Sequence, residues 1–332
     1  MRYKRLGKCG INVSEFCLGT MNFGDETDEP TAATILKRAV DLGINFIDTA
    51  NTYAKGRSEE IVGRAIKGMR ESLVLATKVR HTMGPGPNDE GLSRKHIIYQ
   101  VQESLRRLDT PYIDILYMHR PSNADIRKGF FREPVPLEET LGALTDLVRW
   151  GKVHYIGCSN FPAWLLCKVL WTSDVHGFEK IVVSQPRYNL LQREIEREII
   201  PFCVDQGIGI VPYSPLAGGS LTGKYKPGIP PPEGSRGAFK PIFFEGNKFH
   251  WEDPKNMSVI QGLEAFSKEV DKPTAQIALA WMLANPAITS PIIAATSIKQ
   301  LEENLAASEL KLSEADLKRI DEIAPVLGPY FT

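Results

Sequence analysis

The chain has 332 residues, enough to bury a sizeable core, and its 40 basic and 40 acidic side chains balance to a formal charge of zero, with a pI near 7.0. This balance argues against a nucleic-acid-binding protein, and no apolar run approaches the roughly 18 residues of a membrane-spanning helix. The five cysteines are scattered and form no C-x-x-C pair or metal-spaced cluster, so we expect free thiols and no metal. The first residues also lack an apolar signal segment, and we therefore expect a cytoplasmic protein.

Strand-like and helix-like segments alternate about eight times along the chain, after residues 1–13, whose alternating pattern predicts a small β-hairpin. Short, almost wholly apolar segments predict strands at residues 15–19, 45–48, 73–78, 113–118, 153–158, 180–184, 208–212 and 291–294. Apolar side chains at helical spacing predict helices at residues 31–42, 58–67, 93–108, 137–150, 162–171, 194–206, 256–270, 274–283, 298–307 and 313–323.

Eight strand–helix units in this length predict an α/β fold, a (β/α)8 barrel that forms one domain over residues 1–332. We expect the hairpin at its N-terminus, a long loop after the seventh strand, rich in glycine and proline, at about residues 217–254, and extra helices at the C-terminus. A doubly wound sheet is the alternative. It usually carries G-x-G-x-x-G after the first strand, and residues 18–24 lack that pattern.

Three neighbouring strands each end in a different ionisable side chain. Asp48 ends the second strand with Tyr53 just beyond it, Lys78 ends the third, and His119 follows the fourth. The carboxyl ends of barrel strands face the active site, so these side chains are expected to meet there. Each of them taken singly is equally well explained as an ion pair or a helix cap. Their occurrence together favours catalysis.

The four side chains form a chemically consistent set. A free tyrosine has a pKa near 10, and a lysine ammonium beside Tyr53 is expected to lower that pKa. A carboxylate at Asp48 keeps Lys78 charged and aimed, and a neutral His119 can hydrogen-bond a carbonyl oxygen. This arrangement suits protonation of an oxyanion while an external hydride attacks the carbonyl carbon, because none of the four is an evident nucleophile.

Over nearly its whole length the sequence resembles the aldo-keto reductase superfamily. The matching motifs are LGTM at 18–21, NFIDTA at 45–50 followed by Tyr53 and Gly56, ATK at 76–78, MH at 118–119, GCSNF at 157–161, QPRYN at 185–189, YSPL at 213–216 and QLEEN at 300–304. The resemblance implies a nicotinamide cofactor bound by a barrel. It implies that Tyr53 is the general acid, that Lys78 and Asp48 tune it, and that His119 orients the carbonyl.

The same resemblance places the cofactor. It implies that Ser159, Asn160 and Gln185 bind the nicotinamide carboxamide and that Tyr213 stacks on the ring, although the sequence alone favours a core aromatic at position 213. The residues expected along the pyrophosphate are Ser214, Pro215, Leu216, Gly218 and Ser220. Further expected contacts are Thr20, Met21, Asp48 and Thr296. Residues 218–225 approach a Walker A loop, but Tyr225 replaces the Ser or Thr that would bind magnesium, which argues against ATP.

The residues expected at the adenosine end of the cofactor match the family less closely. Many relatives place a basic residue after the eighth strand to hold a 2′-phosphate, whereas residues 294–298 here are uncharged. A branch that includes the potassium-channel β subunits uses a lysine and an arginine from the long loop instead, and this chain resembles that branch. We therefore expect NADP(H), held by Lys224, Arg236, Gln300, Glu303 and Asn304.

Three functions are consistent with the sequence, and the complete set of four acid–base side chains favours the first. The first is an NADPH-dependent reductase of small-molecule aldehydes and ketones. The second is a regulatory NADP(H) sensor like the channel β subunits, which differ at the strand end that here carries His119. The third is a sugar or polyol dehydrogenase. Side chains that could line the substrate pocket or pack loops are Phe130, Phe131, Phe243, Phe244 and Trp251, and nearby charges are Arg120, Arg127, Lys128 and Arg132.

Overall fold

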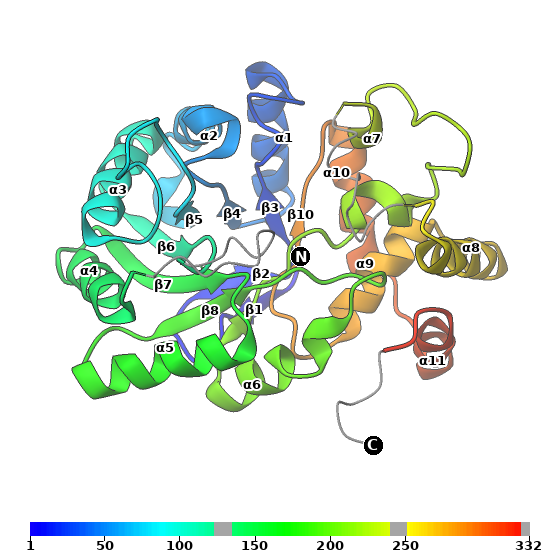
Figure 1. Cartoon of the computed structure of the whole chain (residues 1–332). Helices are drawn as coiled ribbons and strands as arrows, with labels where there is room; N and C mark the ends of the chain where they lie inside the picture. The colour runs from blue at the N-terminus through cyan, green and yellow to red at the C-terminus, as the bar shows by residue number, and fades with distance from the viewer. Residues whose placement is uncertain (123–134, 240–250, 327–332) are drawn as a thin grey trace.

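A computed structural model describes residues 1–122, 135–239 and 251–326 of the chain (Figure 1). Eight parallel strands form one sheet in the order β10-β3-β4-β5-β6-β7-β8-β9. These strands are β3 (Cys17–Gly19), β4 (Phe46–Asp48), β5 (Val74–Val79), β6 (Ile113–Met118), β7 (Val153–Ser159), β8 (Ile181–Gln185), β9 (Gly209–Ile210) and β10 (Ile292–Ile293). The expected (β/α)8 architecture is confirmed.

Backbone hydrogen bonds close the sheet on itself. The Thr289 N–H donates to the Ile210 oxygen at 2.8 Å, and the Ile292 N–H donates to the Pro212 oxygen at 2.8 Å. These bonds join the segments that contain β9 and β10, the two ends of the strand order. A closed barrel leaves no exposed sheet edge, and it brings the carboxyl ends of all eight strands to one rim.

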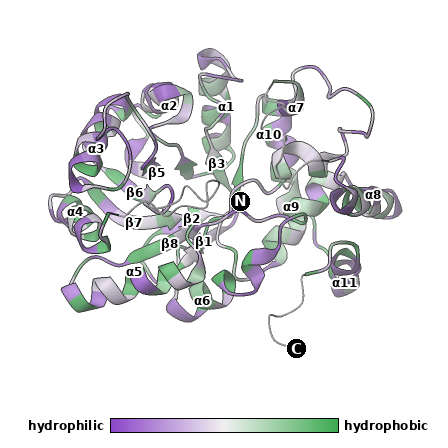
Figure 2. Ribbon diagram, in the orientation of Figure 1, coloured by the Kyte–Doolittle hydropathy of each residue, from purple (hydrophilic) through white to green (hydrophobic). Residues whose placement is uncertain are grey.

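Helices surround the barrel, and in Figure 2 the outlying helices α2 and α3 carry many hydrophilic residues. The principal helices are α1 (Glu29–Asp41), α2 (Arg57–Ala65), α3 (Arg94–Leu108), α4 (Leu137–Arg149), α5 (Ala163–His176), α6 (Ile199–Gln206), α8 (Pro254–Glu269), α9 (Thr274–Ala284), α10 (Ile298–Leu305) and α11 (Glu314–Ile323). Shorter helices are η1 (Tyr53–Gly56), η2 (Arg70–Ser72), η4 (Glu194–Glu196), η5 (Ala217–Thr222), α7 (Arg236–Phe239) and η7 (Ala306–Ser308).

The largest differences from the predicted helices are at residues 194–206 and 162–171. The helix expected over residues 194–206 is broken, because proline at position 201 has no N–H to donate and its ring would clash with the Arg197 carbonyl group. The chain instead forms η4 and restarts at α6, where Pro201 falls in the first turn. Helix α5 runs beyond the predicted end at residue 171 to His176. It stops at Gly177, whose φ of 65° is left-handed.

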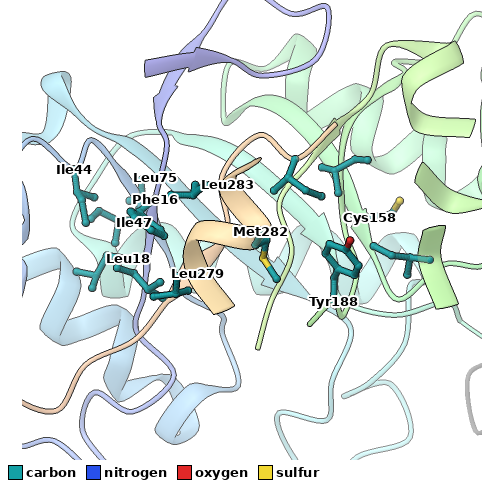
Figure 3. Packing of buried hydrophobic residues seen from close by; sticks show 14 of the residues in the cluster. Phe16, Leu18, Ile44, Ile47, Leu75, Cys158, Tyr188, Leu279, Met282 and Leu283 are labelled. Carbon is teal, nitrogen blue, oxygen red and sulfur yellow. The ribbon is translucent and has the colours of Figure 1, made fainter. Parts of the chain in front are cut away.

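Two apolar clusters fill the structure. One lies within the barrel and includes Leu6, from the loop between β1 (Tyr3–Arg5) and β2 (Asn12–Ser14), so the predicted hairpin forms and contributes to the barrel interior. The other cluster packs the strands against the helices. Figure 3 labels members of that cluster from β3, β4 and β5 and from α9, among them Leu18, Ile47, Leu75, Leu279 and Met282. The packed interior holds the rim of the barrel in place for the side chains that follow the strands.

Candidate active site

The four acid–base side chains predicted from the strand ends lie together at the carboxyl rim. Asp48 is the last residue of β4, Lys78 lies in β5, and His119 directly follows β6; these three strands are neighbours in the sheet. Tyr53 begins η1, five residues after Asp48. Asp48, Tyr53 and His119 line a cavity of about 950 Å³, and Lys78 lies behind its wall with a fully buried side chain.

A buried ion pair is the centre of this group. The Lys78 ammonium contacts the Asp48 carboxylate directly, donates to the Thr49 carbonyl oxygen at 2.8 Å, and donates to the Tyr53 hydroxyl at 3.2 Å. The second oxygen of Asp48 accepts from the Gln185 amide at 2.8 Å. Because each charge keeps hydrogen-bonding partners, the cost of burying the pair is partly offset, and the ammonium is aimed at the phenol.

Burial and charge act in opposite directions on these groups. Burial lowers the pKa of Lys78, but the charges of Asp48 and Tyr53 raise it, and the net pKa lies above the ordinary value. The expected lowering of the Tyr53 pKa is wrong for this geometry. Burial raises that pKa more than Lys78 lowers it, so the phenol keeps its proton at neutral pH.

His119 is held as a neutral ring. Burial, followed by the charges of Lys78 and of nearby cations, lowers the pKa of His119 well below its usual value. Its ring makes edge contacts with the Tyr53 ring, at a centroid distance of 5.9 Å, and with the His81 ring, at 4.5 Å. His119 therefore faces the phenol as an uncharged hydrogen-bonding group, as its position after β6 predicts.

The turn that carries Tyr53 has an uncommon backbone. Ala54, Lys55 and Gly56 all have positive φ values, and an added side chain at Gly56 would lie 2.9 Å from the Arg107 side chain. Arg107 also donates to Glu59 at 2.7 Å, and the same buried carboxylate accepts from Thr77, beside Lys78, at 2.6 Å. Glu59 thus ties the start of α2 to α3 and to β5, which fixes the turn relative to Lys78.

The residues expected to bind the carboxamide line the same cavity and already bond to one another. The Ser159 hydroxyl donates to the Gln185 backbone oxygen at 2.7 Å, and the Asn160 amide donates to the His119 backbone oxygen at 3.1 Å. The Tyr213 hydroxyl donates to Asn160 Oδ1 at 2.7 Å. This chain of hydrogen bonds fixes planar and polar groups along one wall, beside the acid–base cluster.

The wall continues along the segment after β9. Of the five residues expected near a pyrophosphate, Ser214, Pro215, Leu216 and Gly218 line the cavity, while Ser220 is fully buried and is not among the lining residues. Gly219 and Thr222 line the cavity instead. The wall also includes the other predicted contacts, namely Thr20, Met21, Thr296, Gln300, Glu303 and Asn304.

Two cations, Lys224 and Arg236, lie in the wall. Burial, followed by the charge of Arg236, lowers the pKa of Lys224, so the two positive groups influence one another. Glu26 Oε1 lies 3.3 Å from Arg236 Nε. Thr296 donates to Gln300 Oε1 from both its backbone N–H and its hydroxyl, each at 3.0 Å. The cluster suits an anionic group on a ligand.

Comparisons with known proteins agree with this geometry. The sequence model described as Aldo/keto reductase family matches residues 15–325. The chain belongs to the aldo/keto reductase family. The uncharacterized oxidoreductase YrpG of Bacillus subtilis is 40% identical, over 99% of this chain and 97% of its own length. The probable voltage-gated potassium channel subunit beta of Arabidopsis thaliana is 37% identical, over 97% and 96%. The L-glyceraldehyde 3-phosphate reductase of Escherichia coli K12 is 34% identical, over 97% and 92%.

In this aldo/keto reductase, sequence reasoning assigned no site role to three ionisable residues of the wall, namely Glu26, His81 and Arg187. Arg187 lies inside the QPRYN motif and donates to the Tyr213 hydroxyl at 3.2 Å, so the motif held a usable signal. Glu26 and His81 lie in loops, and nothing in their local sequence marks them. Trp251, a possible pocket residue, is stacked on Tyr225 and packs the long loop instead.

Phe130, Phe131, Phe243 and Phe244, and the charged residues Arg127, Lys128 and Arg132, lie outside the described part of the chain. Among the described residues, no helix is both long and apolar enough to span a bilayer. Within residues 1–122, 135–239 and 251–326, no three His, Cys, Asp or Glu side chains are grouped to hold a metal ion.

Proposed function

We propose that this aldo/keto reductase is an NADPH-dependent enzyme that reduces aldehydes or ketones to alcohols, with Tyr53 as the general acid. The observation that supports it most directly is the contact of the Tyr53 hydroxyl with the Lys78 ammonium, 3.2 Å away, at the wall of a cavity shared with a neutral His119. A phenol that keeps its proton and faces a cation is suited to giving that proton to a developing oxyanion.

The cavity suits a dinucleotide. Its volume of about 950 Å³ extends from the acid–base cluster to Lys224 and Arg236, and amide, aromatic and cationic side chains follow one another along its wall. Ser159, Asn160 and Gln185 would hold the carboxamide, Tyr213 would stack on the ring, and the two cations would hold the 2′-phosphate. The nicotinamide cofactor, when bound, supplies a hydride to the carbonyl carbon.

The residues of the chain supply the proton and the electrostatics. His119 hydrogen-bonds the carbonyl oxygen and orients it toward Tyr53. The Tyr53 O–H bond breaks as its proton passes to that oxygen, and the Lys78 ammonium stabilises the tyrosinate that is left. Asp48 holds Lys78 charged and in place, and a proton from solvent restores Tyr53. Alcohol oxidation is the reverse of these steps.

Replacing Tyr53 with phenylalanine tests this role. The variant keeps the ring and loses the proton, so turnover should fall by about 10²–10⁴-fold, the range typical of a lost general acid. The assay follows NADPH oxidation with small aldehydes, ketones, sugars and glyceraldehyde 3-phosphate, the last because one relative is named for its reduction. NADPH binding should not change. Near-normal turnover of Tyr53→Phe would show that another group supplies the proton.

A matched control is Tyr188→Phe. Tyr188 is also buried and its hydroxyl bonds Glu196 at 2.7 Å, yet it does not line the cavity. Loss of the Tyr188 hydroxyl should leave turnover unchanged.

Running the same samples with NADP⁺ and sugars or polyols tests the oxidative direction, in which Tyr53 would act as the base.

A second function, an NADP(H)-binding regulatory subunit, has support from the likeness to the Arabidopsis channel subunit. The two functions separate in one experiment. Tight NADPH binding without turnover on the panel would favour regulation, whereas turnover that depends on Tyr53 would favour catalysis.

We also propose that the protein works in a reducing compartment such as the cytoplasm, since its five cysteines are all free thiols in the structure.

A further inference from the structure

A carboxylate stands beside the two cations that are proposed to hold the 2′-phosphate. Glu26 Oε1 lies 3.3 Å from Arg236 Nε, and the side chains are only 8% and 17% exposed. The charge of Glu26 also acts on Lys224, whose pKa it raises against the effects of burial and of Arg236. All three residues line the cavity, so a ligand that reaches Lys224 and Arg236 also meets the Glu26 carboxylate.

The loop after β3 holds Glu26 in place. The Thr27 N–H donates to the Asn22 oxygen at 2.9 Å, and the Gly24 N–H donates to the Thr27 oxygen at 2.8 Å. The buried Asn22 amide donates to the Thr27 hydroxyl at 2.8 Å and to the Ala295 backbone oxygen at 2.7 Å. These bonds tie the loop to the segment after β10, so the carboxylate has little freedom to leave the site.

A carboxylate and a cationic side chain at this position favour different cofactors. In nicotinamide enzymes of other folds, a carboxylate accepts hydrogen bonds from the ribose 2′-hydroxyl of NAD, whereas an arginine accommodates the 2′-phosphate of NADP. A phosphate monoester carries about −1.5 to −2 charges at neutral pH. It would bind Lys224 and Arg236 and be repelled by Glu26, whereas the neutral hydroxyl of NADH could donate to Glu26 and leave the ion pair with Arg236 intact.

We propose that Glu26 is a specificity-determining residue that limits the preference of this protein for NADPH over NADH. The proposal rests on the proposed function, in which Lys224 and Arg236 hold the 2′-phosphate. The ion pair between Glu26 and Arg236 must be shared or broken when a phosphate arrives, and it can persist when a hydroxyl takes its place. The chain therefore binds both cofactors, and Glu26 sets the ratio of their affinities.

The variant Glu26→Gln keeps the shape of the side chain and removes its charge. Dissociation constants for NADPH and NADH are measured on the full-length protein by quenching of its intrinsic fluorescence. The NADPH-to-NADH preference should rise by about tenfold or more, the scale expected when one like charge is removed beside a partly buried anion. An unchanged ratio, or a ratio that moves toward NADH, would overturn the proposal.

Glu29→Gln is the matched control. It makes the same change in net charge three residues away, in an ion pair with the exposed Arg64, and Glu29 does not line the cavity. Its cofactor ratio should equal that of the unaltered protein. A ratio that rises as much in Glu29→Gln as in Glu26→Gln would also overturn the proposal, because net charge alone would then explain the effect.

Arg236→Ala separates this proposal from the function on which it rests. If Arg236→Ala weakens NADPH far more than NADH, the phosphate site is correct and the result for Glu26→Gln decides the role of Glu26. If Arg236→Ala weakens both cofactors equally, the 2′-phosphate site is misplaced and the proposal for Glu26 fails with it. Thermal unfolding of each variant shows whether a changed affinity reflects lost folding.

Discussion

Replacing Lys78 with methionine should destabilise the protein and abolish turnover. Lys78 is fully buried and Asp48 is 3% exposed, so the substitution leaves a carboxylate in the barrel without its cation. Asp48 keeps the hydrogen bond from the Gln185 amide, which donates to the other carboxylate oxygen at 2.8 Å. Removing one partner of a buried pair typically costs about 3–5 kcal/mol, and that is the loss in unfolding free energy that we expect.

A double variant distinguishes charge from packing. Asp48→Asn removes the orphaned charge, and the new amide can still accept from Gln185. Lys78→Met combined with Asp48→Asn should therefore recover most of the stability that Lys78→Met loses, since a buried ion pair can often be replaced by neutral side chains at little cost. Turnover should not return, because Tyr53 would still lack a cation to stabilise its tyrosinate.

Urea unfolding of the four proteins gives the coupling free energy, and NADPH oxidation by the same samples gives turnover. If the double variant were as unstable as the sum of the two single variants, Lys78 and Asp48 would not form a coupled pair. If Lys78→Met kept near-normal turnover, the proposed stabilisation of the Tyr53 oxyanion would be wrong.

Two further predictions concern the surroundings of the site. Burial, followed by the charge of Arg120, lowers the pKa of His81 to about 4, whereas the unfolded chain takes up this proton near pH 6.5. The stability that neutral His81 contributes is thus complete above pH 6.5 and is lost as the pH falls toward 4, so His81→Asn should flatten the pH dependence of urea unfolding in that window. Thr77→Val removes the 2.6 Å bond to Glu59, whose carboxylate keeps Arg107. Thr77→Val should lower the free energy of unfolding by about 1–3 kcal/mol and should lower kcat more than it changes KM. Thr77→Ser should restore both the stability and kcat. A kcat that stays unchanged in Thr77→Val would exclude a positioning role for Thr77.

Much of the fold was predictable because each strand is a short apolar run between helices of amphipathic spacing. Parallel strands buried on both faces leave that pattern wherever they occur. The errors came where a single residue outweighed the pattern. Pro201 interrupts one predicted helix. Gly177 ends α5 and lies beyond the predicted end of that helix. Closure of the barrel through Ile210 and Pro212 depends on tertiary contacts, which no local pattern encodes.

The candidate site was predictable to the extent that its residues end strands. Asp48, Lys78 and His119 share a rim because neighbouring parallel strands point the same way. The direction of the Tyr53 pKa was not predictable, since the charge of Lys78 is visible in the sequence and the desolvation of a buried phenol is not. The role of Glu26 was not predictable from its local sequence, because Arg236, which its carboxylate contacts, lies 210 residues away.

The buried ion pair bears on the choice between catalysis and sensing. Binding a dinucleotide needs the amides, the aromatic wall and the cations, and Lys78 does not line the cavity with them. Its ammonium instead contacts Asp48, the Thr49 carbonyl oxygen and the Tyr53 hydroxyl. A charge pair in a barrel core is expensive compared with apolar packing of the same volume. Such a local cost is expected at functional sites, and an ammonium directed at a phenol is suited to proton transfer rather than to affinity.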